Sequence, residues 1–112
     1  MAKQFFPKIG NIQFDGPGSK NPLAFKHYQA DEVVEGRPMK DHLRFAAVYW
    51  HTMRGVGADM FGSGTVDRSW NTGECSTKEA IARAHAFFEF ATKLGVPFYC
   101  WHDRDLASHA RI

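Results

Sequence analysis

The segment between Ser76 and Gly95 constrains this fold most, because it carries both a start and a stop signal for one helix. Ser76 is followed three residues later by Glu79, which is the capping-box pattern of a helix N-terminus. Gly95 stands where a left-handed residue would end the helix. Apolar residues recur between them at helical spacing, namely Ile81, Ala84, Phe87, Phe88, Ala91 and Leu94. We therefore predict a helix that begins after Ser76, runs to about Leu94 and buries this face.

Apolar runs at residues 43–50 and 96–101 flank this helix. The first is almost continuous, which is typical of a parallel strand covered on both faces. The second follows a Gly-Val-Pro turn and has the length of a short buried strand. Strand, loop, helix and strand in this order predict one right-handed β-α-β crossover in an α/β fold.

Both predicted strands end in polar and aromatic side chains, at Trp50 and at residues 101–105. Ionisable groups at the carboxyl ends of parallel strands are typical of the rim of an α/β barrel, where active sites gather. His102 and Asp105 are three residues apart. If the chain turns after Trp101, the Asp105 carboxylate can hydrogen-bond one imidazole nitrogen and leave the other for a substrate. A solvated loop of mixed charge is the alternative interpretation.

Residues 1–42 show little helical periodicity and many Pro and Gly residues. Short helical turns are conceivable at residues 22–25 and 31–35, the latter ending before Gly36. We interpret this segment as an arm that lies over another surface. A disordered tail is the alternative, but five aromatic residues argue against free solvation: Phe5, Phe6, Phe14, Phe25 and Tyr28.

Glycines punctuate the loop at residues 55–64. No Gly-Lys-Ser/Thr follows them and the spacing is not Gly-x-Gly-x-x-Gly, so a flexible loop is favoured over a phosphate cradle. Phe61 is unusual there, since a bulky apolar side chain among glycines needs a core pocket or a partner.

Composition limits the function further. The 112 residues are 44% hydrophobic, which suits one small globular domain. The net charge is +2 and the basic residues are scattered, so we expect no nucleic-acid partner and no membrane association. Cys75 and Cys100 lack the spacing of a disulfide framework, which indicates a reduced cytoplasm. The six histidines include no pair at helical ligand spacing, so we expect no metal site.

Several separate motifs resemble xylose isomerase, of the type with a longer N-terminal extension. They occur in the family's order: residues 40–45, 49–52, 61–62 and 100–105, preceded by matching segments at 6–7, 16–17 and 19–26. The resemblance covers about residues 5–107. It implies an N-terminal fragment of a TIM (β/α)8 barrel, with an arm at 1–42, the first β-α-β unit at 43–107 and a divergent tail at 108–112.

The resemblance also implies a function. The family converts D-xylose to D-xylulose by a hydride shift assisted by two divalent ions, commonly Mg2+, Mn2+ or Co2+, and is a cytoplasmic homotetramer. His102 corresponds to the catalytic histidine that binds the sugar near its ring oxygen, and Asp105 to the aspartate that orients it. Trp50 corresponds to a wall of the sugar cleft. Phe61 corresponds to the phenylalanine that one subunit inserts into its neighbour's active site.

Two departures from the family pattern matter. The loop has Met60 where the family usually has proline, which affects its rigidity. After Ala107 the family's Pro-Glu-Gly and further units are replaced by the short tail. The family's metal ligands lie in the missing part, so we expect a truncated chain that holds no metal and is inactive alone. The alternative is a non-catalytic module that docks on, or oligomerises with, a full-length homologue through its arm and Phe61.

Overall fold

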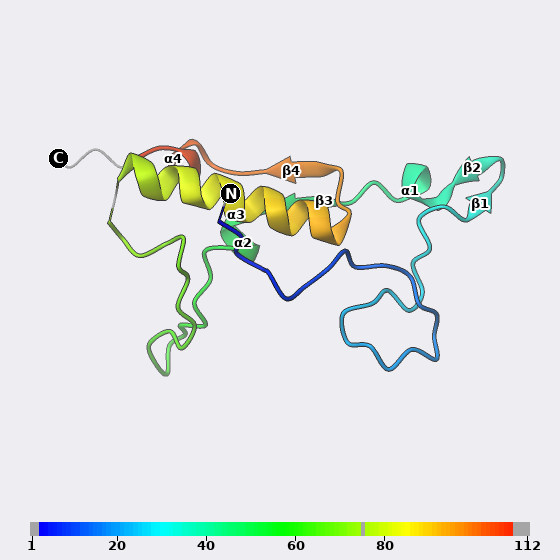
Figure 1. The fold of residues 1–112 in the computed structure, drawn as a ribbon, viewed down its shortest axis with the longest axis horizontal. Coiled ribbons are helices and arrows are strands. Elements are labelled where there is room, and N and C mark those ends of the chain that lie inside the picture. Colours follow the sequence, from blue (N-terminus) through cyan, green and yellow to red (C-terminus); the bar gives the residue numbers. More distant parts are fainter. Residues whose placement is uncertain (1–2, 75, 109–112) are drawn as a thin grey trace.

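The computed structural model describes residues 3–74 and 76–108, which form an α/β fold. Cys75 and the tail beyond Ser108, with His109, lie outside the described residues. The elements, in chain order, are β1 (Val33–Val34), β2 (Arg37–Pro38), α1 (Met39–His42), β3 (Ala46–Val48), α2 (Tyr49–Thr52), α3 (Thr77–Leu94), β4 (Phe98–Cys100) and α4 (Asp103–Leu106). Figure 1 shows α3 alongside β3 and β4, with the β1–β2 hairpin at the far end of an elongated molecule.

The ends of α3 confirm the helix prediction. The Ser76 hydroxyl accepts a hydrogen bond from the Glu79 amide at 3.1 Å. Gly95 has φ 77°, in the left-handed region, and its amide donates to the carbonyls of Ala91 and Thr92. Both signals act within one turn of the helix, which is why the sequence was sufficient to locate the two ends.

β3 and β4 pair in parallel, with Ala46 opposite Phe98 and Val48 opposite Cys100. Since α3 connects them, the predicted β-α-β order is confirmed. The sheet has two strands within residues 3–74 and 76–108, and it does not close into a barrel.

The first strand is shorter than its apolar run predicted. The chain leaves the sheet at Tyr49, where α2 begins, and the Met53 amide donates to the Tyr49 carbonyl at 2.8 Å. Trp50 therefore lies in a helical turn and not in a strand. Hydrophobicity did not show this change, because Tyr49 remains completely buried after the strand has ended.

The core lies between α3, α2 and the end of the long loop. Its buried residues are Ala47, Tyr49, Met53, Trp70, Ala86 and Phe87. The predicted apolar face of α3 was wrong in part, because Ile81 and Phe88 are 53% and 42% exposed. Glu79 and Arg83 are buried in the same helix. The buried face is thus rotated toward two charged residues, which an apolar pattern cannot show.

The start of the arm is tied to α3. The Glu89 carboxylate accepts the amides of Phe5 and Phe6 at 2.7 and 2.9 Å, and the Lys93 ammonium donates to the Phe6 carbonyl at 2.5 Å. Both phenylalanine rings contact Trp70, with centroids 5.8 and 5.6 Å away. Phe5 and Phe6 are thus packed against α3 and Trp70.

Residues 31–35 do not form the helical turn that the sequence suggested. Val33–Val34 and Arg37–Pro38 pair as an antiparallel hairpin. Its turn residues, Glu35 and Gly36, have φ values of 49° and 76°. Positive φ at both central residues is the geometry of a tight hairpin turn, and Glu at the first position concealed it from the sequence.

Candidate functional site

The site is formed where both parallel strands end. β3 continues into α2, and β4 continues through Trp101 into α4. Because the strands are parallel, these two exits lie at the same end of the sheet. Trp50 in α2 and His102 before α4 meet there, with ring centroids 4.2 Å apart and planes 27° apart. The structure therefore brings together two residues that the sequence analysis assigned to one site.

His102 is exposed, whereas Trp50 is half-buried. The indole stacks on one face of the imidazole, while the His102 residue as a whole is exposed. A stacked, exposed imidazole can donate or accept a hydrogen bond with a polar ligand that lies against the same indole. The arrangement is thus suited to a ligand with hydroxyl groups and an apolar face.

Asp105 reaches back to His102, but to its main chain. One carboxylate oxygen accepts the His102 amide at 3.0 Å, and the other forms an ion pair with Arg54. Asp105 is 3% exposed, while Arg54, which follows α2, is 38% exposed. The contact with the imidazole that the spacing suggested is therefore replaced by one with the backbone. Asp105 joins α4 to the segment after α2 and holds the turn in which His102 lies.

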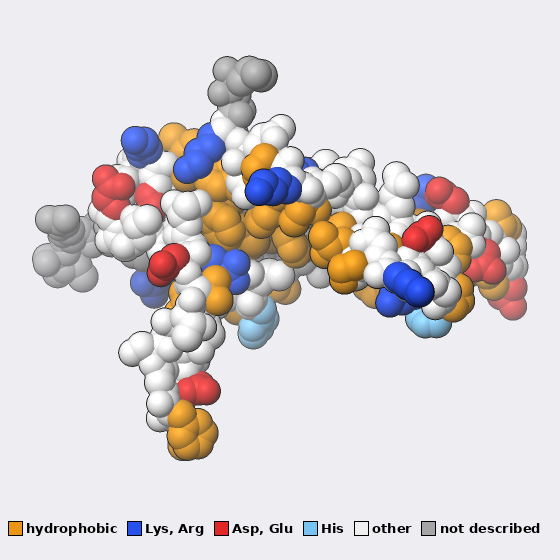
Figure 2. Space-filling model, turned by 60° about the horizontal axis from the view of Figure 1, so that its bottom comes forward, with side chains coloured by type: hydrophobic (Ala, Val, Ile, Leu, Met, Phe, Trp, Pro, Cys, Tyr) orange, Lys and Arg blue, Asp and Glu red, His pale blue; other side chains and the backbone are white. Residues whose placement is uncertain are grey.

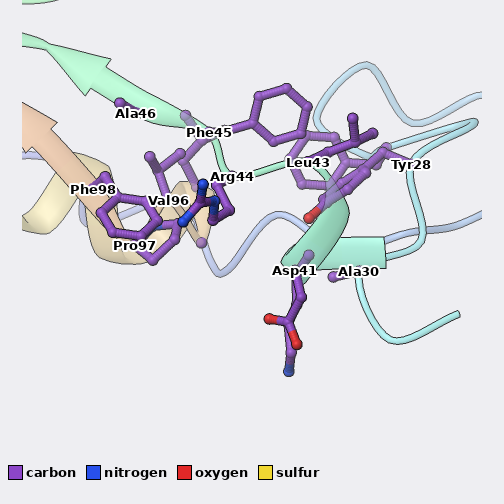
Figure 3. Close-up of a pocket in the computed structure, with 14 residues that line it drawn as sticks. Tyr28, Ala30, Asp41, Leu43, Arg44, Phe45, Ala46, Val96, Pro97 and Phe98 are labelled. Atoms are coloured by element: carbon purple, nitrogen blue, oxygen red, sulfur yellow. The ribbon is translucent and has the colours of Figure 1, made fainter. Parts of the chain in front are cut away.

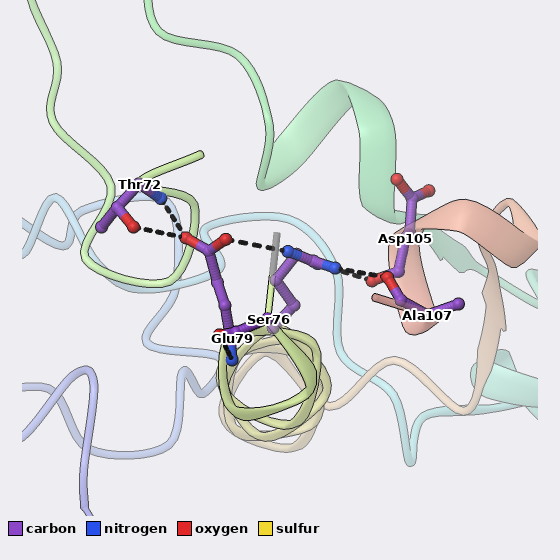
Figure 4. A network of polar contacts seen from close by, with 6 residues as sticks. Thr72, Ser76, Glu79, Asp105 and Ala107 are labelled. Atoms are coloured by element: carbon purple, nitrogen blue, oxygen red, sulfur yellow. Dashed lines mark hydrogen bonds and ion pairs between the residues drawn. The ribbon is translucent and has the colours of Figure 1, made fainter. Parts of the chain in front are cut away.

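A buried polar network supports this turn from the side of α3 (Figure 4). The Arg83 guanidinium donates to the carbonyls of Asp105 and Ala107 at 2.7 and 2.8 Å. It also approaches Glu79 at 3.5 Å, and Glu79 accepts the Thr72 hydroxyl at 2.7 Å. Arg83 and Glu79 are 4% and 5% exposed. Arg83 belongs to no motif noted in the sequence, although its spacing of four residues from Glu79 was a signal for an ion pair.

Comparison with known proteins identifies relatives. No protein-family model matches the chain. A xylose isomerase of Rhodopirellula baltica is 57% identical over 102 residues, which are 91% of this chain and 23% of the relative. One from Xanthomonas campestris pv. campestris is 54% identical over 109 residues, 97% of this chain and 24% of the relative. The chain is homologous to the xylose isomerases.

A xylose isomerase of Caldanaerobacter subterraneus subsp. yonseiensis agrees, at 49% identity over 93% of this chain and 24% of the relative. The predicted resemblance to the N-terminal portion of xylose isomerases is thereby confirmed. The chain spans about a quarter of the length of these xylose isomerases.

Phe61 lies on the loop between α2 and α3, which projects from the body of the molecule with apolar side chains near its end (Figure 2). Its side chain is 89% exposed. The Asp59 side chain accepts the Phe61 amide at 2.8 Å, and the Asp59 amide donates to the Gly62 carbonyl at 3.1 Å. The loop is therefore turned at this point by Asp59.

No group of three or more His, Cys, Asp or Glu side chains that could hold a metal ion is present within residues 3–74 and 76–108. The residues around His102 thus do not fit a divalent ion by themselves, since Asp105 is already paired with Arg54. Over the same part of the chain, no helix has the length and apolar character needed to cross a membrane.

An apolar groove lies away from Trp50 and His102. It has a volume of about 660 Å³ and is apolar, with lining residues that include Phe25, Tyr28, Leu43, Phe45, Val96 and Phe98 (Figure 3). It borders the amino ends of β3 and β4, because Ala46 and Phe98 begin these strands and contribute to its wall. In a parallel sheet this is the end opposite to the Trp50–His102 pair.

Proposed function

We propose that this chain forms the first part of a xylose isomerase barrel and contributes one side of its sugar site. The stacking of Trp50 and His102 at the carboxyl ends of two parallel strands carries this proposal. In (β/α)8 barrels the active site lies at this end of the strands. The homology to xylose isomerases supplies the substrate class, an aldose such as D-xylose that is converted to its ketose.

Each residue then has a defined task. The Trp50 indole walls the cleft and excludes water beside the sugar. The exposed His102 imidazole hydrogen-bonds the sugar near its ring oxygen and assists ring opening. Asp105 acts through the backbone, since it holds the His102 amide and pairs with Arg54.

Two divalent ions would supply the charge that stabilises the migrating hydride in the complete enzyme. The described residues of this chain offer no cluster of ligands for them. We therefore propose that the ligands come from the part of a xylose isomerase to which this chain does not correspond. The chain alone would be inactive.

The open surfaces of the sheet support the same proposal. Phe45, Phe98 and Tyr99 are 49%, 47% and 53% exposed beside a sheet that has two strands within the described residues. Parallel sheets are normally covered on both faces, and a pair of strands is only marginally stable alone. The remaining β-α units of a barrel would cover these residues and the apolar groove.

Phe61 supports a role between subunits. An 89% exposed phenylalanine beside Met60, which is 88% exposed, loses its contact with water when another chain covers it. We propose that Phe61 enters the active site of a neighbouring subunit in a cytoplasmic homotetramer.

Complementation tests the function. The 112-residue chain is produced alone and together with the remaining three quarters of the Rhodopirellula baltica relative, and conversion of D-xylose is measured with Mg2+ or Mn2+. We expect no turnover by the chain alone and turnover by the pair.

In the complemented pair, His102→Asn and Trp50→Ala should each abolish most of the turnover, whereas His85→Asn, on the exposed side of α3, is the matched control. Turnover by the chain alone, or a paired activity indifferent to His102→Asn, would contradict the proposal.

The exposed tip at Met60 and Phe61 also favours a second candidate, a non-catalytic module that docks on a full-length homologue. Such a module should co-purify with an intact xylose isomerase subunit in a fixed ratio, and Phe61→Ala should abolish the complex. A complex of this kind together with no complementation would favour the module over the barrel portion.

A further inference from the structure

Arg83, a buried side chain of α3, contacts the backbone after β4 through two donors. Its Nε donates to the Asp105 carbonyl at 2.7 Å, and its Nη2 donates to the Ala107 carbonyl at 2.8 Å. The guanidinium presents its donors in a rigid fork, so two carbonyls fix both the distance and the orientation of the segment they belong to. α4 and the residue that follows it are therefore attached to α3 at two points.

The charge of this fork is compensated inside the protein. Glu79, one helical turn earlier on α3, approaches Arg83 at 3.5 Å and is itself bonded by Thr72. Both charged side chains are almost completely buried. A buried ion pair contributes little net stability compared with apolar residues of the same size, although breaking it by removal of one partner is costly. The ion pair and its hydrogen bonds connect the end of the long loop, α3 and α4 at one place.

Asp105 transmits this attachment to the site. Its carbonyl is held by Arg83, while its carboxylate holds the His102 amide and Arg54. The four residues from His102 to Asp105 form a single turn, since the Asp105 amide also donates to the His102 carbonyl at 3.0 Å. A rotation or shift of this turn would move the His102 ring relative to Trp50, which is carried by a different element.

We infer that Arg83 is a positioning residue that sets the stacking of His102 on Trp50 by anchoring the far end of the turn that carries His102. The inference rests on the proposed function for the claim that this stack serves sugar binding, but the geometry it concerns can be measured without activity. Arg83 would touch neither the sugar nor the reacting atoms. Its effect would pass through Asp105.

The experiment uses proton NMR on the complete 112-residue chain. The ring protons of His102 lie over the Trp50 indole and should be shifted upfield by its ring current. Trp50→Leu identifies that shift. Arg83→Lys keeps the charge beside Glu79 but loses the fork, so we expect the His102 ring protons to lose most of their upfield shift while the rest of the spectrum stays folded. Arg83→Met with Glu79→Gln removes both charges and should have the same effect.

Lys93→Met is the matched control. Lys93 lies on the same helix, pairs with a glutamate four residues earlier and donates to a backbone carbonyl, but at the arm and not at α4. This variant should lower the stability and leave the His102 shift unchanged. If Arg83→Lys or the double variant folds with the wild-type His102 shift, the inference is overturned. Loss of the His102 shift in Lys93→Met would also overturn the inference. Loss of any anchoring contact of α3 would then be enough to disturb the stack, and Arg83 would have no special role.

The outcome separates the two proposals. If the complemented enzyme is active and depends on His102, but the Arg83 variants retain the shift, this inference fails and the proposed function stands. If the Arg83 variants lose the shift while the complemented enzyme is inactive, the positioning role stands and the sugar function fails.

Discussion

Trp50 and His102 stack with their ring centroids 4.2 Å apart, although they follow different strands of the sheet. The parallel pairing of β3 and β4 brings their carboxyl ends together, and α2 and α4 begin at these ends. The two rings are held by separate elements, and Asp105 connects these elements through Arg54. The site is thus determined by contacts between the two strand exits.

Asp105→Asn should weaken the connection between α2 and α4. The variant keeps the shape of the side chain but loses the ion pair with Arg54. Because Arg54 is partly exposed, solvent screening reduces the contribution of this ion pair to stability. We expect a loss of about 1–3 kcal/mol in the free energy of unfolding, because a buried polar group loses its charged partner. Urea denaturation measures it. Asp103→Asn, on the same turn but exposed, is the control and should stay within about 0.5 kcal/mol of the wild type.

Glu89 should make attachment of the arm dependent on pH. Burial alone would raise the pKa of this carboxyl, but hydrogen bonds from the amides of Phe5 and Phe6 and the charge of Lys93 outweigh it and lower the pKa. Because the folded-state pKa is depressed, the stabilisation is complete above about pH 4.3, the value of a free glutamate, and is lost as the pH falls through the folded-state pKa.

The fluorescence of Trp70, which both phenylalanine rings contact, reports release of the arm. In the wild type we expect an acid transition in this signal. Glu89→Gln should remove the transition and show a released arm already at neutral pH, whereas Glu32→Gln, exposed in the arm, should retain it. An unchanged acid transition in Glu89→Gln would show that another group controls the arm.

Tyr49→Phe should not destabilise the protein. The Tyr49 ring is fully buried, and its hydroxyl has no hydrogen-bond partner among the described residues. Burial raises the pKa of this hydroxyl, against the opposing influence of the Arg83 and Arg54 cations. Removal of an unsatisfied buried hydroxyl should leave the free energy of unfolding unchanged or raise it by about 1 kcal/mol. Tyr99→Phe, at an exposed position, is the control; a clear loss in Tyr49→Phe would reveal a partner for the hydroxyl.

Gly95→Ala should destabilise the end of α3 through its backbone conformation alone. Gly95 has φ +77°, and nothing lies within 4 Å of the position that a Cβ would occupy. The left-handed conformation costs an L-residue about 1–2 kcal/mol, so thermal or urea unfolding should show a loss of this size. Gly18→Ala adds the same methyl group in open space outside the left-handed region and should have little effect. Equal losses in both variants would argue against the conformational explanation.

The sequence predicted those features that depend on neighbouring residues. The N-cap of α3 at Ser76, its C-cap at Gly95 and the order of strand, helix and strand all follow from signals within a few residues. Its motifs also gave the resemblance to xylose isomerases that the relatives confirm, and the structure stacks the rings of Trp50 and His102, which that resemblance assigns to the sugar cleft.

Tertiary structure decided the rest, because burial of a charge depends on partners from distant segments. Glu79 matched a capping box and Arg83 belonged to no pattern in the sequence, but both are buried where the long loop and α4 meet α3. In the same way Asp105 was expected at the His102 ring, and it holds the His102 amide because Arg54 fixes its other oxygen. Local sequence determines where elements begin and end, whereas packing between elements determines which polar groups meet.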